Sequence, residues 1–158
     1  MIAGIDPGQT GAIAFISSSG KVEIYDTPIE MVKKGKGIKK EYLPGNMADL
    51  LRAIDLNHVF IESVHAMPGQ GVTSMFNFGK GFGIWIGILA ALKIPYTLIT
   101  PQAWKKHLMQ GIKDKDAARI RAQQLYPSVS EELSRKKDIG RADALLIAEY
   151  GRLTLNFL

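Results

Sequence analysis

The sequence predicts an α/β domain in which three antiparallel strands come first and later strands alternate with helices. Residues 2–25 consist of short apolar or alternating segments separated by glycine-rich turns, which is the pattern of β-hairpins. Residues 58–64 form an apolar run containing one acid, as expected for a strand covered on both faces. Longer segments with helical apolar spacing follow. A chain of 158 residues suits a single domain, which we place at residues 1–158.

The N-terminal elements begin with a predicted hairpin. Residues 2–5 and 12–16 are apolar, and Pro7, Gly8 and Gly11 supply turn chemistry between them. Residues 21–25 alternate as a half-buried strand does. Residues 26–45 are basic and interrupted by prolines and glycines, so we expect a mobile excursion there. Asn46 is expected to cap a helix over residues 47–54 that lies on the sheet.

The second half of the chain alternates helices with a further strand. Residues 66–74 predict an exposed loop, and residues 75–93 predict a long apolar helix. In that helix small residues recur every four positions, at Gly79, Gly83, Gly87 and Ala91. Such a stripe lets another backbone approach closely, either the domain's own sheet or a second copy of the chain. Residues 94–100 predict a strand, Pro101 starts a helix, and two more helices are expected from about Asp114 to residue 125 and over residues 139–153.

The composition favours a polyanionic partner. The net charge is +5, the sequence pI is about 9.4, and the lysines fall in clusters. A solvated lysine face is the alternative interpretation of any one cluster. The lack of cysteine excludes disulfides, thiolate metal ligands and cysteine nucleophiles. No apolar run reaches the roughly 18–20 residues that span a bilayer, so we expect no membrane association and a cytoplasmic location.

Two of the predicted strands end in a carboxylate. Asp6 follows the first strand, and Glu62 lies near the end of the strand at residues 58–64. A buried acid without a partner is costly in a medium of low dielectric constant. Capping of the following turn would explain Asp6 by itself. Two acids at adjacent strand ends are better explained by one hard cation bound between them.

A third carboxylate lies on the last predicted helix. Asp143 shares a helical face with Leu146, Ile147 and Tyr150, the face that should be buried. A salt bridge is the alternative explanation, but three core-facing acids fit a divalent-cation site better. Asp138 is a fourth candidate. In an unbroken helix it would point about 140° away from Asp143 at ~100° per residue, so it joins the site only as a cap or a residue before the helix.

With these residues the chain resembles the RuvC-type Holliday junction resolvases of the RNase H-like superfamily, particularly the compact phage and poxvirus branch. The resemblance covers nearly the whole chain and rests on five segments in order: Gly4-Ile-Asp6-Pro-Gly8 with Thr10-Gly11, Phe60-Ile-Glu62, Thr100-Pro101 with Trp104-Lys105, Lys115-Asp116-Ala117 leading to Leu125-Tyr-Pro127, and Ala142-Asp143-Ala144-Leu145. It implies a mixed five-stranded sheet with helices on both faces, a homodimer, and cleavage of four-way DNA junctions with Mg²⁺ or Mn²⁺.

The resemblance also implies site residues. Asp6, Glu62 and Asp143 match the family's metal-binding acids, and Lys105 and Lys115 match basic positions that face the junction. Two Mg²⁺ ions roughly 3.5–4 Å apart would then activate water and stabilise the leaving 3′-oxygen, with Lys105 neutralising charge on the phosphate. Further DNA-binding lysines are expected at Lys33, Lys34, Lys36, Lys39, Lys40 and Lys106.

The chain departs from the family pattern just before Asp143. Family members often carry an acid or histidine three residues ahead of the final aspartate, where this chain has Gly140. We therefore expect either Asp138 or water as the fourth ligand. His65 and Met67 follow Glu62 at the place where relatives put a residue near the junction crossover, so stacking on bases is one role for them and an ordinary loop position is the other.

The expected function is that of a structure-selective endodeoxyribonuclease, a crossover junction resolvase acting in recombination and repair, with a bacteriophage origin and hence a host-cytoplasmic location implied. One alternative is a nuclease of the same fold that cuts other branched DNA or RNA–DNA hybrids. Another is a non-catalytic nucleic-acid-binding protein. ATP-using phosphotransferases open with a similar Asp-x-Gly-x-Thr hairpin, but they need two such domains, and this chain has room for one.

Overall fold

The computed structural model describes every residue except 111, 113, 115, 157 and 158. The strands are β1 (Ile2–Asp6), β2 (Ala12–Ile16), β3 (Val22–Asp26), β4 (Ile29–Lys34), β5 (Gly37–Tyr42), β6 (His58–Glu62) and β7 (Tyr96–Ile99). The α-helices are α1 (Pro44–Arg52), α2 (Val72–Ala91), α3 (Pro101–Leu108), α4 (Ala117–Leu125) and α5 (Ile139–Thr154). Two 3₁₀ helices, η1 (Pro127–Leu133) and η2 (Lys136–Asp138), precede α5.

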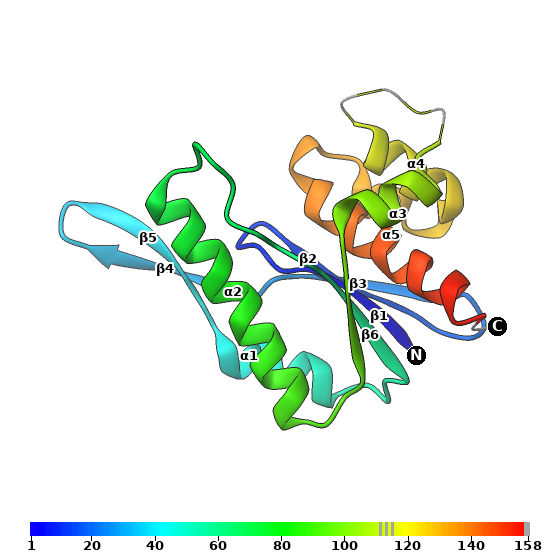
Figure 1. The fold of residues 1–158 in the computed structure, drawn as a ribbon, viewed down its shortest axis with the longest axis horizontal. Helices are drawn as coiled ribbons and strands as arrows, with labels where there is room; N and C mark the ends of the chain where they lie inside the picture. The colour runs from blue at the N-terminus through cyan, green and yellow to red at the C-terminus, as the bar shows by residue number, and fades with distance from the viewer. Residues whose placement is uncertain (111, 113, 115, 157–158) are drawn as a thin grey trace.

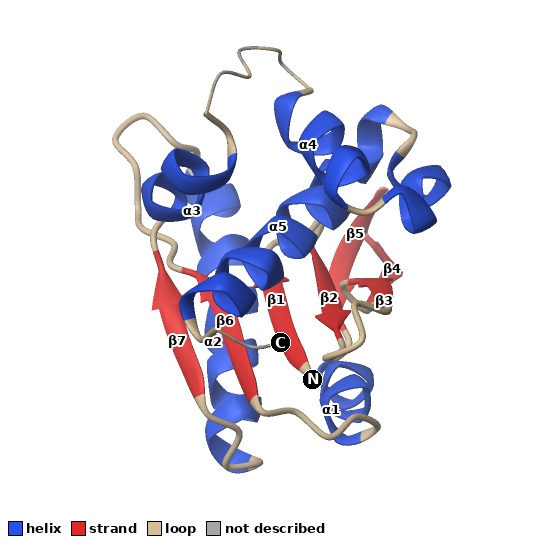
Figure 2. Ribbon diagram, turned by 90° about the vertical axis from the view of Figure 1, so that its right-hand side faces the viewer, coloured by secondary structure: helices blue, strands red, loops and turns tan. Residues whose placement is uncertain are grey.

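Five of the strands form one mixed sheet in the order β3-β2-β1-β6-β7. The first three strands are antiparallel, and β6 and β7 then run parallel to β1. Figure 2 shows this sheet with α3, α4 and α5 on one face and α1 and α2 on the other. The predicted mixed sheet of five strands, covered by helices on both sides, is therefore confirmed.

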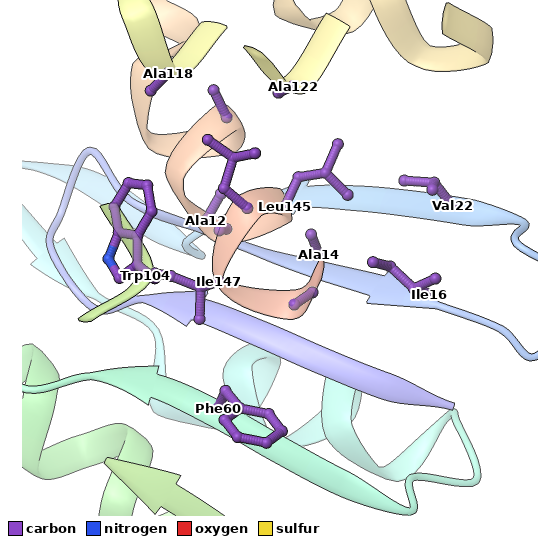
Figure 3. Close-up of a cluster of buried hydrophobic side chains, with 14 of the residues drawn as sticks. Ala12, Ala14, Ile16, Val22, Phe60, Trp104, Ala118, Ala122, Leu145 and Ile147 are labelled. Atoms are coloured by element: carbon purple, nitrogen blue, oxygen red, sulfur yellow. The ribbon is translucent and has the colours of Figure 1, made fainter. Parts of the chain in front are cut away.

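Each face of the sheet has its own apolar core, because successive residues of a strand point to opposite sides. On β1, Ile2 packs into the core beneath α3, α4 and α5, whereas Ala3 and Ile5 pack into the core beneath α1 and α2. Figure 3 shows the first of these cores, in which Trp104, Leu145 and other apolar side chains gather around α5.

Helix α5 packs directly on β1 because Gly4 has no side chain. A Cβ at Gly4 would collide with the carbonyl oxygen of Ala144 and the backbone of Ala148. The residues in contact are therefore small on both elements, which lets the helix lie close to the strand. This close packing fixes which residues of α5 lie against the end of β1.

The segment from residue 26 to residue 45 differs from the prediction. It contains an antiparallel hairpin, β4 paired with β5, that forms a second, two-stranded sheet. A two-residue turn at Gly35 and Lys36 joins the strands, and Gly35 adopts a φ of +60° that glycine tolerates best. The lysines and glycines of this segment concealed the few apolar strand residues, Met31, Val32 and Ile38.

The starts of three helices also differ from the prediction. Helix α1 begins at Pro44 rather than after Asn46, since proline suits the first helical turn and Leu43 occupies the cap position without a side-chain hydrogen bond. Helix α2 begins at Val72, three residues before the predicted start. The helix expected to restart near Asp114 begins at Ala117 in the structure.

The predicted stripe of small residues on α2 does not pack against the sheet. Trp85 and Leu89 are the side chains of α2 that are fully buried in the core. A Cβ added at Gly79, Gly83 or Gly87 would meet no atom of the described residues within 4 Å. Of the two expectations for this stripe, packing on the domain's own sheet is therefore wrong.

Among the residues that the structure describes, none of the helices combines the length and apolar character needed to cross a bilayer.

Candidate active site

Two carboxylates lie side by side at one edge of the sheet. Asp6 ends β1 and Glu62 ends β6. The parallel register pairs Ile5 with Ile61, so continuing it by one residue sets Asp6 beside Glu62. By the alternation of the strands, Asp6 faces the same side as Ile2, and Glu62 the same side as Phe60, which is the side that α5 covers. Both acids thus face α5.

Helix α5 supplies a third carboxylate to this place. Asp143 lies one residue before Ala144, whose carbonyl is packed on Gly4 of β1. Leu146 and Ile147, on the same helical face, are fully buried, as the sequence predicted. No ion pair to Asp143 is formed within the described part of the chain, so a salt bridge does not account for its buried position.

The three carboxylates repel one another electrostatically. Burial and the nearby charge of Glu62 raise the pKa of Asp6 from 3.8 to about 6. Burial, followed by the charges of Asp6 and Glu62, raises the pKa of Asp143 from 3.8 to about 7. Lys105 is the one cation that lowers either pKa, and its influence is the smallest. The cluster therefore carries negative charge that the described residues do not neutralise.

The turn after β1 leaves Asp6 largely free to bind a ligand. Its only hydrogen bond in the described structure comes from the Gly8 N–H at 3.5 Å, which is the outer limit for such a bond. Turn capping, the alternative explanation of Asp6, is therefore weak. Glu62, in contrast, is held firmly: the indole N–H of Trp104 donates to its Oε2 at 2.7 Å.

Helix α3 brings Trp104 and Lys105 to the site together. The Thr100 side chain caps the helix by accepting from the Ala103 N–H, and Pro101 occupies its first turn. Trp104 is completely buried, and the Lys105 ammonium lies 5.2 Å from the centre of its ring. The sequence analysis missed the bond from Trp104 to Glu62. One feature of the sequence pointed to this bond. Trp104 directly precedes the site candidate Lys105, and the N–H of a buried tryptophan needs a hydrogen-bond partner.

The structure separates Asp138 from the three acids. Asp138 accepts hydrogen bonds from the backbone N–H of Arg135 at 2.8 Å and from its guanidinium at 2.8–3.2 Å. These bonds hold the pKa of Asp138 below its usual range, and the other charges that reach it come chiefly from Arg141. Its carboxylate is thus already occupied, as the cap of a short helix rather than as a partner of Asp143.

Gly140, the departure from the family pattern, has a steric cause. A Cβ at this position would collide with the carbonyl oxygen of Thr10 in the turn after β1. The first turn of α5 packs so closely on that turn that a larger residue has no room. The described residues therefore offer no side chain at the position where relatives carry a fourth ligand.

The carboxylates of Asp6, Glu62 and Asp143 are not close enough together in this structure to bind one ion between all three. Within the described ranges, no group of three or more Asp, Glu or His side chains is close enough to hold an ion between them. The donor set nevertheless fits Mg²⁺ or Mn²⁺: all three groups offer oxygen, and their mutual repulsion falls when a cation binds.

The remaining predicted site residues lie in the loop after β6, on α3 and on the β4–β5 hairpin. His65 and Met67 lie in the loop between β6 and α2, and Met67 is 63% exposed. Lys105 and Lys106 are exposed on α3. Lys115 lies outside the described residues. The other predicted lysines all lie on the β4–β5 hairpin: Lys33, Lys34, Lys36, Lys39 and Lys40.

The sheet order β3-β2-β1-β6-β7, with helices on both faces, is the RNase H-like fold of the RuvC type. Solved structures agree. The structure of Thermus thermophilus RuvC in complex with a Holliday junction substrate superposes with a TM-score of 0.66 at 15% identity, over 98% of this chain and 94% of that one. A second Thermus thermophilus RuvC structure gives a TM-score of 0.59 at 17% identity, over 99% and 96%. The chain therefore has the RuvC-type fold.

A curated relative agrees at the level of sequence. The chloroplastic Holliday junction resolvase MOC1 of Chlamydomonas reinhardtii is 34% identical over 92 residues, which is 58% of this chain. The match spans 10% of that protein's length. No family model matches the chain.

Proposed function

We propose that this protein is a structure-selective endodeoxyribonuclease that resolves four-way DNA junctions. The observation that carries the proposal is that Asp6, Glu62 and Asp143 all lie on the same side of a RuvC-type sheet, where burial and their neighbouring negative charges raise the pKa values of Asp6 and Asp143. Support comes from the junction-bound RuvC that shares the fold and from the resolvase that shares part of the sequence.

The metal site in this proposal consists of Asp6, Glu62 and Asp143. Mg²⁺ or Mn²⁺ bound there, as two ions in the proposed arrangement, would supply activation of water and stabilisation of the leaving oxygen. Trp104 keeps the Glu62 carboxylate in a fixed orientation through the bond to Oε2. Lys105 adds a positive charge beside the acids and is proposed to bind the phosphate. We leave Asp138 out of the set because Arg135 already binds it.

DNA binding is proposed for the basic and loop residues around the acids. Lys105 and Lys106 on α3 would bind phosphates near the cut, and the hairpin lysines would bind an arm. Lys115, which lies outside the described residues, is proposed to bind DNA from the family resemblance alone. Phosphate contacts of this kind give affinity that falls with salt but carry no sequence information. His65 and Met67, in the exposed loop after Glu62, would contact bases near the crossover.

A homodimer is also part of the proposal. The stripe formed by Gly79, Gly83 and Gly87 lies open on α2, so a second helix can approach it closely. Two copies related by a twofold axis would present two sets of acids to the two strands that must be cut. Light scattering at micromolar concentration tests this: a monomer that still resolves junctions would contradict it.

The decisive experiment compares cleavage of a synthetic four-way junction with cleavage of a linear duplex and of an RNA–DNA hybrid, with and without Mg²⁺. We expect metal-dependent paired cuts in the junction alone, and none from Asp6→Asn, which should still bind. Equal cutting of all substrates would instead assign a general nuclease of this fold. Tight binding without any cut would assign a non-catalytic binding protein.

A further inference from the structure

The β4–β5 hairpin is fixed at its base and free at its tip. At the base, Tyr42 is buried and its hydroxyl donates to the Asn77 carbonyl of α2 at 2.9 Å. The Gln9 amide, in the turn after Asp6, donates to the Lys40 carbonyl at 2.9 Å. Figure 1 shows the hairpin extending past α2, away from the main sheet. Its position relative to the acid site is therefore set, while its outer half has no partner among the described elements.

The two faces of this hairpin differ in chemistry. The register pairs Ile29 with Tyr42, Met31 with Lys40, and Lys33 with Ile38. Residues paired across the strands, and residues two apart along them, share a face. These three pairs form one surface, which we call the wedge face. The opposite surface carries both glutamates of the hairpin and is tied to α2 by the ion pair between Glu41 and Lys80 at 2.9 Å.

The wedge face exposes apolar side chains flanked by lysines. Met31 is 65% exposed and Ile38 is 76% exposed. Each is paired directly across the strands with a lysine, Lys40 and Lys33 respectively. Proteins that enter the minor groove of DNA combine these two features: cations contact the phosphates, and an apolar residue such as Met or Ile is inserted between base steps.

The base of the wedge face lies beside the turn that follows Asp6. A cleft of about 480 Å³ has Tyr42 on one wall and Gly8, Gln9 and Thr10 on another. A second cleft, of about 370 Å³, joins Ile29 and Lys40 to the same turn. Both clefts thus connect residues of the wedge face to the turn that follows Asp6. A nucleic acid that passes from the acids over this turn would reach the base of the wedge face, and Met31 and Ile38 follow from there along the hairpin.

We propose that the wedge face enters the minor groove of a DNA arm next to the cut. Met31 and Ile38 insert between base pairs and unstack one step, while Lys33 and Lys40 bind the flanking phosphates. The hairpin carries five lysines and two glutamates, so its charge favours DNA over a second copy of the chain. This inference rests on the proposed function, since it names the part of the substrate that the hairpin contacts.

The test uses the Asp6→Asn variant, which leaves the DNA uncut, and junctions carrying 2-aminopurine at successive positions along each arm. Insertion predicts a rise in fluorescence at one step, because unstacking relieves quenching. Replacing Met31 and Ile38 together with serine should abolish that rise and weaken binding by about tenfold. Val32→Ser is the matched control, since Val32 lies on the opposite face and is 36% exposed; it should leave the signal unchanged.

The lysines are tested separately by the dependence of affinity on salt. Changing Lys33 and Lys40 to glutamine should reduce the slope of log K against log salt by about 2, at ~0.9 per phosphate contact. Lys21→Gln should not change the slope, because Lys21 is exposed beside β3 and already paired with Glu23.

The outcomes separate the two proposals. If the Asp6→Asn protein binds no junction, the proposed function fails and the wedge fails with it. If it binds but no position brightens, or if the serine pair behaves like Val32→Ser, the wedge alone is overturned. Conversion of a dimer to a monomer by the serine pair would also overturn it, because the face would then be a contact between copies.

Discussion

Replacing Asp143 by asparagine should stabilise the metal-free protein and abolish its response to Mg²⁺. In the native state the pKa of Asp143 is about 7, and its reference value is 3.8. Between these values the unfolded chain has released the proton while the native protein keeps it. Native protein therefore binds more protons, and its stability falls as pH rises from about 4 to about 7. Above pH 7 the penalty is constant, and asparagine does not incur it.

The size of the effect follows from the pKa difference. A change from 3.8 to about 7 corresponds to roughly 4 kcal/mol at ~1.36 kcal/mol per pKa unit. The Asp143 side chain keeps some access to solvent, so we take about half of this, ~2 kcal/mol, as the gain for Asp143→Asn at pH 8. At pH 5 the gain should be less than half as large, because most of the titration range has not yet been crossed.

Urea unfolding in EDTA at pH 5 and pH 8 measures this gain, and repeating it with Mg²⁺ measures the metal response. Saturation at 100 times Kd adds about 2.7 kcal/mol, which the wild type should gain and the variant should not. Asp138→Asn is the control: Arg135 lowers the pKa of Asp138, so its stabilisation is present above pH 4, and its loss should destabilise the protein at pH 8. A variant at 143 less stable than the wild type at pH 8 in EDTA, or equally stabilised by Mg²⁺, would refute the reasoning.

Three further predictions concern the residues around the acids. Trp104→Phe keeps the packing but removes the hydrogen-bond donor to Glu62. We expect kcat to fall with little change in KM, and the free energy of unfolding to drop by about 1–3 kcal/mol. A raised KM at full kcat would contradict this. Lys105→Gln removes the cation that lowers the pKa of two carboxyls, so the acid limb of single-turnover cleavage should move to higher pH, and an unchanged profile would count against that role. Gly4→Ala should lower the free energy of unfolding in urea by at least ~2 kcal/mol, because the added Cβ meets the backbone of α5. Gly45→Ala, at an open position of α1, is the control and should change stability by less than ~1 kcal/mol. Equal effects of the two substitutions would refute the packing argument.

The three acids could be found from sequence because each interrupts a regular apolar pattern. Asp6 and Glu62 close apolar strands, and Asp143 falls on a stripe that must be buried. Strand alternation and helix periodicity are local, so one sequence suffices to assign each side chain to a face. That the faces meet also depends on the parallel pairing of β1 with β6. The sequence permits that pairing, and the resemblance to a known fold supplied it.

Contacts between segments that are distant in the sequence could not be predicted from strand alternation or helix periodicity. The bond from Trp104 to Glu62 joins residues 42 positions apart, and nothing in the spacing of α3 indicates it. Asp138 looked like a ligand because it is an acid near Asp143, but a local partner three residues away, Arg135, satisfies it. The hairpin was missed for a different reason: its apolar residues are exposed, so the lysines dominated the composition.

The absence of a side chain at two glycines decides how the acid cluster is built. Gly4 lets α5 rest on β1, and Gly140 lets the start of α5 rest on the turn after Asp6. Together they hold α5, which carries Asp143, close to the strand and turn around Asp6. Burial, followed by the charge of the neighbouring carboxylates, raises the pKa values of Asp6 and Asp143. Gly140 is also why the chain lacks a fourth acid there. The same two glycines therefore determine both the close packing of α5 and the placement of the carboxylates that would bind cations. A substitution that loosens α5 should weaken metal binding even if every carboxylate is retained.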